Sequence, residues 1–212
     1  MSGGDVERYW TQRARSFDRL YDLPPLERLV NRIFRRAIYQ RYDLTFANAG
    51  DVSGKRVLDA GAGSGRHAVE FARRGAAEVV GVDFAADMLA LANAYAAAEG
   101  VADRCRFVRS DFNDFTDARP FDIAIAIGFF DYIADPLKTL RHMGELTRGR
   151  VMASFPKPQL VRSQLRTRRY ASRGVHIRYY RRAEIEQLAK DAGFRSIRVI
   201  PISAGYFLVA DI

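Results

Sequence analysis

The chain has 212 residues, 48% of them hydrophobic, and a formal net charge of +9. These values fit a folded domain with a substantial core and exclude an intrinsically disordered protein. The single cysteine, Cys105, excludes an internal disulfide framework, and no Cys/His cluster indicates a metal site. The sequence has neither a secretory signal pattern nor an apolar run long enough to span a bilayer, so we expect a cytoplasmic protein.

Residues 1–50 are expected to form an N-terminal helical cap. The first helix, at 5–18, carries the aromatic residues Tyr9 and Trp10. Two prolines at 24–25 separate it from a second helix, in which apolar residues recur at helical spacing between Leu26 and Ile38. We therefore place a domain boundary near residue 50 and the main domain at 51–212.

From residue 51 onward, strand and helix patterns alternate. The expected strands are 56–60, 78–84, 105–112, 121–129, 150–155, 195–202 and 206–212, and the expected helices are 65–74, 86–98, 136–146 and 182–192. Alternation predicts an α/β fold with a parallel sheet and helices on both faces. The tight connection at 203–205 joins the last two strands, which must then be antiparallel. The prediction is a seven-stranded, mostly parallel sheet with the last strand antiparallel.

The stretch that organises this pattern is Arg56–Gly65, which reads R-V-L-D-A-G-A-G-S-G. An apolar run ends in Asp59, and a helical pattern begins at Arg66. Between them, three glycines stand at alternate positions: Gly61, Gly63 and Gly65. A strand that ends in a glycine turn and opens a helix is typical of a cofactor cradle, because glycines allow close backbone approach and the helix N–H groups face the ligand. A dinucleotide fingerprint requires a further glycine where Arg66 stands, so the loop alone leaves the ligand open.

Aspartates close the next two expected strands. Asp83, 18 residues after Gly65, is placed to accept both hydroxyls of a ribose, although it could instead cap the following helix. Asp111 can accept from an adenine amino group while Phe112 covers the ring. An isolated aspartate of this kind is more often a turn residue. Together with the glycine loop, both aspartates favour a ligand that contains adenosine.

The motifs V-L-D-A-G-A-G-S-G, G-V-D and S-D-F resemble, in combination, those of the class I S-adenosylmethionine-dependent methyltransferases. The resemblance extends from about residue 55 to 212. It implies a Rossmann-like sheet of seven strands with the last one reversed, S-adenosyl-L-methionine as methyl donor and S-adenosyl-L-homocysteine as product. The cofactor-binding positions that it implies are Asp59, Gly61, Ala62, Gly63, Gly65, Asp83, Phe84, Met88, Asp111, Phe112, Gly128 and Phe129.

The same resemblance assigns a role to each group of these positions. The aspartate and glycines of the first motif would hold the methionine moiety, and Ala62 replaces the Cys or Gly of the common family form. Asp83 would bind the ribose, with Phe84 and Met88 against the adenine. Gly128 and Phe129 would border the site of methyl transfer.

Candidate catalytic residues follow the expected fourth strand. Asp131 and Tyr132 are the nearest candidates for a base or an orienting group, with a loop carboxylate and a packing tyrosine as the alternative. His176 is a third candidate, although each histidine of the chain is more often structural. The chain lacks the Asn/Asp-Pro-Pro-aromatic run of enzymes that methylate nucleobase amino groups, and no cysteine lies in a loop near the site. Both features count against a nucleic-acid acceptor.

The excess positive charge lies in one segment, because residues 150–182 hold ten basic side chains and no acidic one. We interpret 157–175 as an insertion that forms an acceptor lid together with the N-terminal helices. The substrate-binding residues expected from these caps are Tyr9, Trp10, Arg166, Arg169 and Tyr180. Arginine suits carboxylate and phosphate recognition, so an anionic partner is favoured: an acidic small molecule, an anionic membrane surface or RNA.

The leading hypothesis from the sequence is methyl transfer to oxygen or nitrogen of a small, anionic molecule. An RNA-binding methyltransferase that uses 150–182 and a non-catalytic cofactor-binding protein remain as alternatives. The sequence indicates neither the acceptor nor the oligomeric state.

Overall fold

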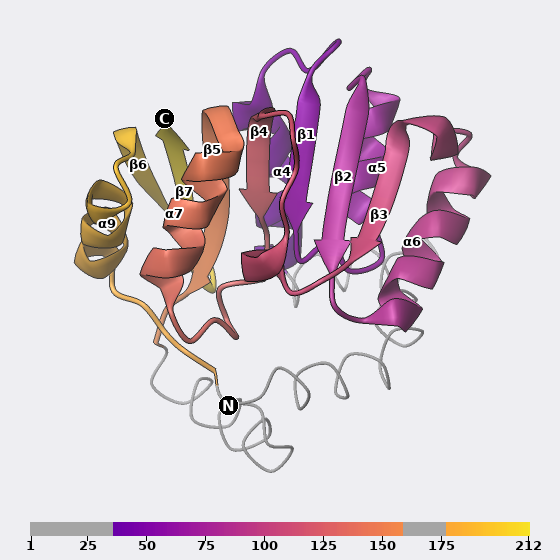
Figure 1. Ribbon diagram of the computed structural model, residues 1–212. Coiled ribbons are helices and arrows are strands. Elements are labelled where there is room, and N and C mark those ends of the chain that lie inside the picture. The colour runs from indigo at the N-terminus through magenta and orange to yellow at the C-terminus, as the bar shows by residue number, and fades with distance from the viewer. Residues whose placement is uncertain (1–35, 159–176) are drawn as a thin grey trace.

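The computed structural model of the chain describes residues 36–158 and 177–212, which form one sheet covered by helices (Figure 1). The strands are β1 (Arg56–Ala60), β2 (Glu78–Asp83), β3 (Cys105–Arg109), β4 (Phe121–Ala126), β5 (Thr147–Pro156), β6 (Arg195–Ile202) and β7 (Gly205–Asp211). The helices are α4 (Arg36–Ala49), α5 (Arg66–Arg73), α6 (Ala86–Ala98), α7 (Pro136–Leu146) and α9 (Arg182–Asp191), with short 3₁₀ turns η1 (Ala102–Arg104) and η2 (Phe112–Asp114).

The seven strands lie in the order β3-β2-β1-β4-β5-β7-β6. The pairs from β3 through β5 are parallel, and β7 runs antiparallel to both β5 and β6. The predicted fold, a mostly parallel sheet with the last strand antiparallel, is therefore confirmed. The reversed strand β7 lies inside the sheet and β6 forms the edge.

Side chains alternate between two apolar cores, one on each face of the sheet. On one face, Leu58 of β1 packs with residues of α7 and α9. On the other, Val57 packs with residues of α4, α5 and α6. The period-2 pattern of the strands thus builds a three-layer structure, as predicted.

The order of the central strands determines where a ligand fits. β1 has β2 on one side and β4 on the other. The helix after β1, α5, packs on one face, whereas the helix after β4, α7, packs on the opposite face. In open α/β sheets, such a reversal leaves a crevice beyond the carboxyl ends of the strands.

Helix α4 belongs to the second of these layers. Its buried residues Phe46 and Ala49 lie in the same core cluster as Val57 and Phe71. It contains the end of the second predicted helix, so this part of the expected cap covers a sheet face. The residues Tyr9, Trp10, Arg166, Arg169 and His176 lie outside the described residues.

Two predicted strands are too long. β3 ends at Arg109, three residues before the predicted end, because Asp111 begins a turn: its Oδ1 accepts a hydrogen bond from the backbone N–H of Asn113 at 2.9 Å. β4 ends at Ala126, since Gly128 has a φ of 76° and leaves the extended conformation. In the structure, residues of the candidate site that were predicted to end these strands therefore lie in loops and do not take part in strand pairing.

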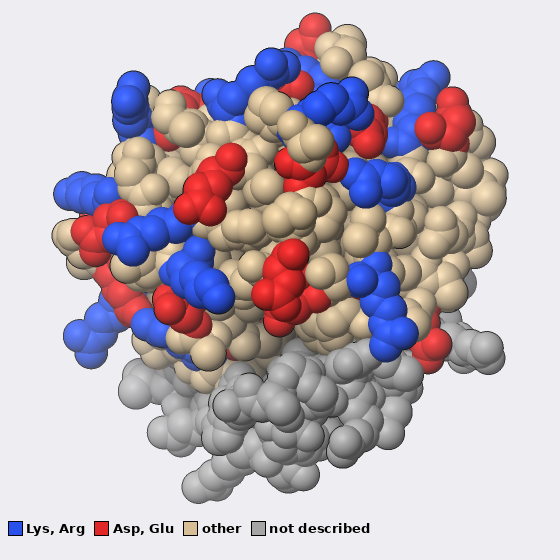
Figure 2. All heavy atoms as spheres, viewed as in Figure 1, with Lys and Arg blue, Asp and Glu red and all other residues tan. Residues whose placement is uncertain are grey.

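On the face shown in Figure 2, positive and negative side chains are interspersed. The largest network lies near the amino ends of the strands, where Arg56 binds Glu78 at 2.7 Å and Asp117 at 3.2 Å. Arg106 and Arg119 bind the same acidic residues. Over residues 36–158 and 177–212, no helix is both long and apolar enough to cross a membrane.

Candidate functional site

The glycine loop between β1 and α5 turns tightly over the end of β2. Gly61, Gly63 and Gly65 all have positive φ values, of 73°, 52° and 77°. The backbone N–H groups of Gly61 and Ala62 both donate to the carbonyl oxygen of Val82. A Cβ at Gly61 would lie 2.5 Å from Cδ2 of Phe129, so only glycine fits this close approach. The loop and the segment after β4 therefore form facing walls of one cradle.

Asp59, at the end of β1, has a buried carboxylate beneath this loop. The residue is 2% exposed, and its Oδ2 has no hydrogen-bond partner among the described residues. Burial, and secondarily the nearby charge of Asp83, raise the pKa of Asp59 to about 7. Leaving one oxygen of a buried carboxylate without a partner is costly, and a cationic ligand would compensate it.

Asp83, at the end of β2, ties the glycine loop to the next turn. Its Oδ2 accepts from the backbone N–H of Gly63 at 2.9 Å, and its Oδ1 accepts from that of Ala85 at 2.9 Å. Burial raises the pKa of this carboxyl, and these hydrogen bonds oppose the shift. The alternative role of Asp83, a cap of the following helix, therefore involves only Oδ1, which binds the N–H of Ala85, the N-cap residue of α6. A carboxylate has about four acceptor positions, so these bonds leave acceptor capacity for a ribose hydroxyl.

Arg41 and His67 are polar residues at this edge that sequence reasoning did not assign. Arg41, on α4, has a buried Nε without a partner among the described residues, and its Nη1 lies 3.5 Å from where a Cβ at Gly128 would be. His67, in the first turn of α5, has a buried Nε2 that also lacks a hydrogen-bond partner among the described residues. Burial and the charge of Arg41 lower the pKa of His67 to about 4, so its ring is neutral. A usable signal was the spacing of Arg41 with Thr45, one turn later on the buried side of α4.

The residues expected around an adenine lie just after β2 and β3 and in the first turn of α6. Met88 is 4% exposed, and its Cε lies 3.3 Å from the Cβ position of Gly63, with Phe84 packed beside it. Phe112 is buried and meets the ring of Phe129 edge-on at 5.8 Å. Asp111 is exposed. The structure therefore brings the predicted adenine residues to the same edge as the glycine loop.

The loop after β4, residues 127–135, holds the candidate catalytic residues and will be named the β4 loop. The N–H of Gly128 donates to Oγ of the buried Ser154 at 2.8 Å. Asp131 is 2% exposed, and Tyr132 is partly buried and donates its N–H to the carbonyl oxygen of Phe129. Asp131 and Tyr132 thus lie in the loop that carries Phe129 over Gly61.

Tyr180, predicted to bind substrate, is instead a core residue. It is fully buried, its ring meets that of Phe155 edge-on at 5.0 Å, and its hydroxyl donates to the carbonyl oxygen of Phe130 at 3.1 Å. Burial raises the pKa of Tyr180 well above its ordinary value. An aromatic side chain can line a ligand pocket, but the ring of Tyr180 packs against Phe155 of β5 instead.

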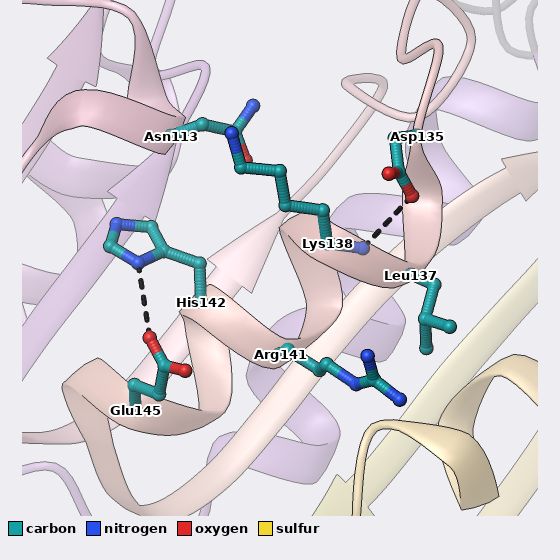
Figure 3. A pocket seen from close by; sticks show the side chains of 7 residues that line it. All are labelled: Asn113, Asp135, Leu137, Lys138, Arg141, His142 and Glu145. Atoms are coloured by element: carbon teal, nitrogen blue, oxygen red, sulfur yellow. Dashed lines mark hydrogen bonds and ion pairs between the residues drawn. The ribbon is translucent and has the colours of Figure 1, made fainter.

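A hollow of about 280 Å³ is lined by α7, by Asp135 before it and by Asn113 of η2, and by no residue of the glycine loop (Figure 3). Asp135 caps the helix by accepting from the backbone N–H of Lys138, and His142 Nδ1 lies 3.5 Å from Glu145 Oε2. None of the seven lining residues is a predicted site residue. Within the described residues, no three His, Cys, Asp or Glu side chains come together as metal ligands.

The arrangement at the glycine loop fits an amino acid joined to a nucleoside. An unpartnered carboxylate oxygen and an unpartnered guanidinium nitrogen, from Asp59 and Arg41, complement an ammonium and a carboxylate. Asp83 is available to diol hydroxyls, and Met88 and Phe112 offer apolar surface. S-adenosylmethionine has all of these groups, so the residues present fit it.

Comparisons with known proteins agree with this geometry. A family model described as a methyltransferase domain matches residues 27–199. A ubiquinone biosynthesis O-methyltransferase of Neisseria meningitidis serogroup C is 29% identical over 196 residues, which cover 87% of this chain and 76% of that protein. A tRNA 5-carboxymethoxyuridine methyltransferase of Escherichia coli K12 is 32% identical over 117 residues, which cover 54% of this chain and 44% of that protein.

Solved structures share the fold over the whole chain. A magnesium protoporphyrin IX methyltransferase of Synechocystis PCC 6803 with bound S-adenosylhomocysteine has a TM-score of 0.76 at 18% sequence identity, and the match covers 99% of both chains. The same enzyme with bound S-adenosylmethionine has a TM-score of 0.71.

Proposed function

The chain belongs to the methyltransferase domain family and is an S-adenosylmethionine-dependent enzyme, and from this premise we propose that it methylates an oxygen atom of a small, anionic molecule. The name of the Neisseria relative, an O-methyltransferase, supports oxygen as the acceptor atom. The names of the relatives do not identify the acceptor of this chain. The residues of the chain itself give the evidence for its acceptor.

The observation that carries the proposal is a pair of buried polar atoms, Asp59 Oδ2 beneath the glycine loop and Arg41 Nε on α4, that have no hydrogen-bond partner among the described residues. We assign the ammonium group of the cofactor to Asp59 Oδ2 and its carboxylate to the guanidinium of Arg41. Both assignments satisfy a buried polar atom that otherwise lacks a partner among the described residues. Asp83 accepts the ribose hydroxyls, and Phe84, Met88, Asp111 and Phe112 surround the adenine.

The remaining cradle residues align the reaction. When bound, S-adenosylmethionine supplies a methyl group on a sulfonium sulfur, which an acceptor atom displaces in line. The chain contributes proximity and orientation, since Phe129 and Gly128 fix the wall opposite Gly61. Closing this wall also excludes water from the site of transfer.

A hydroxyl acceptor must lose its proton as the new bond forms. We assign this proton to the carboxylate of Asp131, with Tyr132 orienting the hydroxyl. Support comes from their position in the β4 loop, next to Phe129, and from the burial of Asp131. His176 is kept as an alternative base.

The anionic character of the acceptor rests on the charge distribution. Of the ten basic residues in 150–182, Arg150, Arg178 and Arg182 are paired with Asp211, Glu184 and Glu186 in the described part of the chain. Five further arginines stand at 159–176, where the sequence offers no acidic neighbour. An anionic acceptor is the simplest partner for such a segment.

The experiment is a transfer assay with isotopically labelled S-adenosylmethionine. The acceptors are phenols with and without a carboxylate, carboxylic acids, primary amines and total RNA. We expect label in the carboxylate-bearing phenols, with the methyl group on oxygen. Label confined to amines would overturn the oxygen assignment, and an equal rate for phenols without a carboxylate would overturn the anionic one.

A second candidate function is methylation of RNA, because one relative is a tRNA methyltransferase by name. Neutralising phosphates releases counterions, so RNA binding by the basic segment would weaken steeply with salt. A salt titration of RNA binding separates the two candidates: tight binding with a steep slope favours RNA, and binding that is absent or insensitive to salt favours the small molecule.

A further inference from the structure

The β4 loop is held by a short segment, residues 177–181, which directly precedes α9. Three carbonyl oxygens of the loop accept hydrogen bonds from just two residues of that segment. The Tyr180 hydroxyl donates to the carbonyl of Phe130 at 3.1 Å, the Arg178 N–H donates to that of Asp131 at 3.0 Å, and Arg178 Nη1 donates to that of Ala134 at 3.1 Å. The bonds span the whole turn that contains Asp131 and Tyr132.

The two residues are themselves fixed to the sheet and to α9. The N–H of Tyr180 donates to the carbonyl oxygen of Pro156 at the end of β5, and its ring is buried against Phe155. Arg178 Nη2 binds Glu184 Oε1 at 2.9 Å, and its guanidinium lies 5.1 Å from the centre of the Tyr180 ring. Residues 177–181 are therefore fixed to the sheet and to α9, and their hydrogen bonds hold the β4 loop in place.

The loop in turn forms one wall of the cofactor cradle. Phe129 lies against Gly61 so closely that a Cβ there would be 2.5 Å from its ring, and it also meets Phe112. A change in the path of the loop would thus move Phe129 relative to the glycine loop. Small displacements of aligned groups are costly to binding and catalysis.

We propose that Arg178 and Tyr180 are positioning residues, which set cofactor affinity by holding the β4 loop so that Phe129 closes the cradle. Neither residue belongs to the cradle itself: Tyr180 is buried on the core side of the loop, and the Arg178 side chain is 40% exposed on its outer side. The inference rests on the cradle assigned above.

The test uses the full chain, with S-adenosylhomocysteine as the probe and calorimetry as the readout. Tyr180→Phe keeps the ring and removes one donor, and Arg178→Ala removes the bond to Ala134. We expect each to weaken binding by about tenfold, since each breaks a hydrogen bond that supports the loop. Arg178→Lys, which keeps a cation near Glu184 and one donor for Ala134, should recover part of the loss.

Arg182→Ala is the matched control, because Arg182 pairs with Glu186 on the same helix and not with the β4 loop. It should bind the probe like the wild type. Hydrogen exchange of the loop amides should rise in Tyr180→Phe and Arg178→Ala but not in the control.

Lower thermal stability with unchanged probe affinity would mean that both residues are merely structural, and would overturn the proposal. Should Tyr180→Phe fail to fold, Arg178→Ala decides alone, because its side chain is partly exposed. A wild-type chain that does not bind the probe would refute the cradle assignment itself, an outcome distinct from equal binding by wild type and variants.

Discussion

Asp59 has a charge that the unliganded protein stabilises poorly, and this makes cofactor binding dependent on pH. Its pKa is raised to about 7, chiefly by burial, and the ammonium group of the cofactor requires the ionised form. Below pH 7, binding must first expel the proton. We expect the affinity for S-adenosylhomocysteine, measured by calorimetry, to fall by about tenfold per pH unit from pH 7 to pH 5.

Asp59→Asn should bind weakly, and without pH dependence over this range. Asp87→Asn, at an exposed position in the first turn of α6, should behave like the wild type. A wild-type affinity that is constant between pH 5 and 8 would contradict the assignment of Asp59 to the ammonium group.

The same raised pKa has an opposite consequence for stability. The ordinary pKa is 3.8, so between about pH 4 and pH 7 the folded state binds more protons than the unfolded state. The free energy of unfolding contributed by Asp59 is therefore highest at low pH and is lost as pH rises through 7. Asp59→Asn should raise the melting temperature of the unliganded protein more at pH 8 than at pH 4.

Gly61 combines a left-handed backbone with contact to Phe129, and the two effects can be separated. Gly61→Ala should destabilise the protein by about 1–2 kcal/mol through its positive φ. It should also weaken S-adenosylhomocysteine binding by roughly tenfold or more, because the new Cβ displaces Phe129. Gly100→Ala has a similar φ of 69° and nothing within 4 Å, so it should show only the loss of stability. Equal affinities for both variants, measured by calorimetry, would contradict the role of Phe129.

The residue types in the sequence indicated the residues of the cradle more clearly than they indicated the residues that surround it. Asp59, Asp83 and the glycines could be proposed as cradle residues because a carboxylate and alternate glycines after an apolar run have few other uses. Arg41 was not assigned, because its one local signal, the spacing with Thr45 on the buried side of α4, does not distinguish a ligand-binding arginine from a solvated one. Tyr180 was misplaced because a tyrosine suits a core as well as a pocket, and only the pairing of β5 with its neighbours decides between them.

Helix α4 connects the sheet core to the cradle, because it carries both Phe46 and Arg41. Phe46 is 7% exposed and packs against Phe71 at 4.8 Å between ring centres. Phe46→Ala should lower the free energy of unfolding by about 3 kcal/mol in denaturant titrations. It should also weaken S-adenosylhomocysteine binding, because α4 shifts and Arg41 moves with it.

Asp43→Ala is the control on the same helix, at an exposed position. It should change neither stability nor affinity. Phe46→Ala could lose stability and still bind S-adenosylhomocysteine normally in the folded state. That result would mean that the position of the Arg41 side chain does not depend on the packing of α4.

The elements themselves were predictable where one signal dominates. Helix α7 matches its predicted bounds of 136–146, since Asp135 caps it and Pro136 starts it. β3 and β4 were predicted too long because Phe112 and Phe129 extend the apolar runs. These residues are apolar because they face the candidate cradle and the core, and a hydrophobic pattern cannot distinguish that from strand pairing.

The charge of the chain is concentrated outside its described part. Residues 36–158 and 177–212 hold 22 basic and 20 acidic side chains, whereas residues 159–176 hold five arginines and no acid. Most of the excess of +9 therefore belongs to a segment whose function only an acceptor assay can reveal. The sheet and cradle identify the methyl donor, and the net charge suggests the class of acceptor.

Replacing Arg166, Arg168 and Arg169 by Gln together tests that suggestion. We expect unchanged affinity for S-adenosylhomocysteine, because the cradle groups Asp59, Arg41 and Asp83 are supplied by other segments. The KM for a carboxylate-bearing acceptor should rise by about tenfold, and its dependence on salt should weaken, because charge-assisted contacts are lost.

The control for that triple variant removes the same charge elsewhere. Arg119, Arg148 and Arg182 are surface arginines paired with Glu78, Asp122 and Glu186, and changing all three to Gln also lowers the net charge to about +6. If both triple variants raise KM equally, the effect comes from the overall field and not from the arginine segment. A collapse of S-adenosylhomocysteine binding in the first variant alone would place the segment in the cofactor cradle, and the lid assignment would then be wrong.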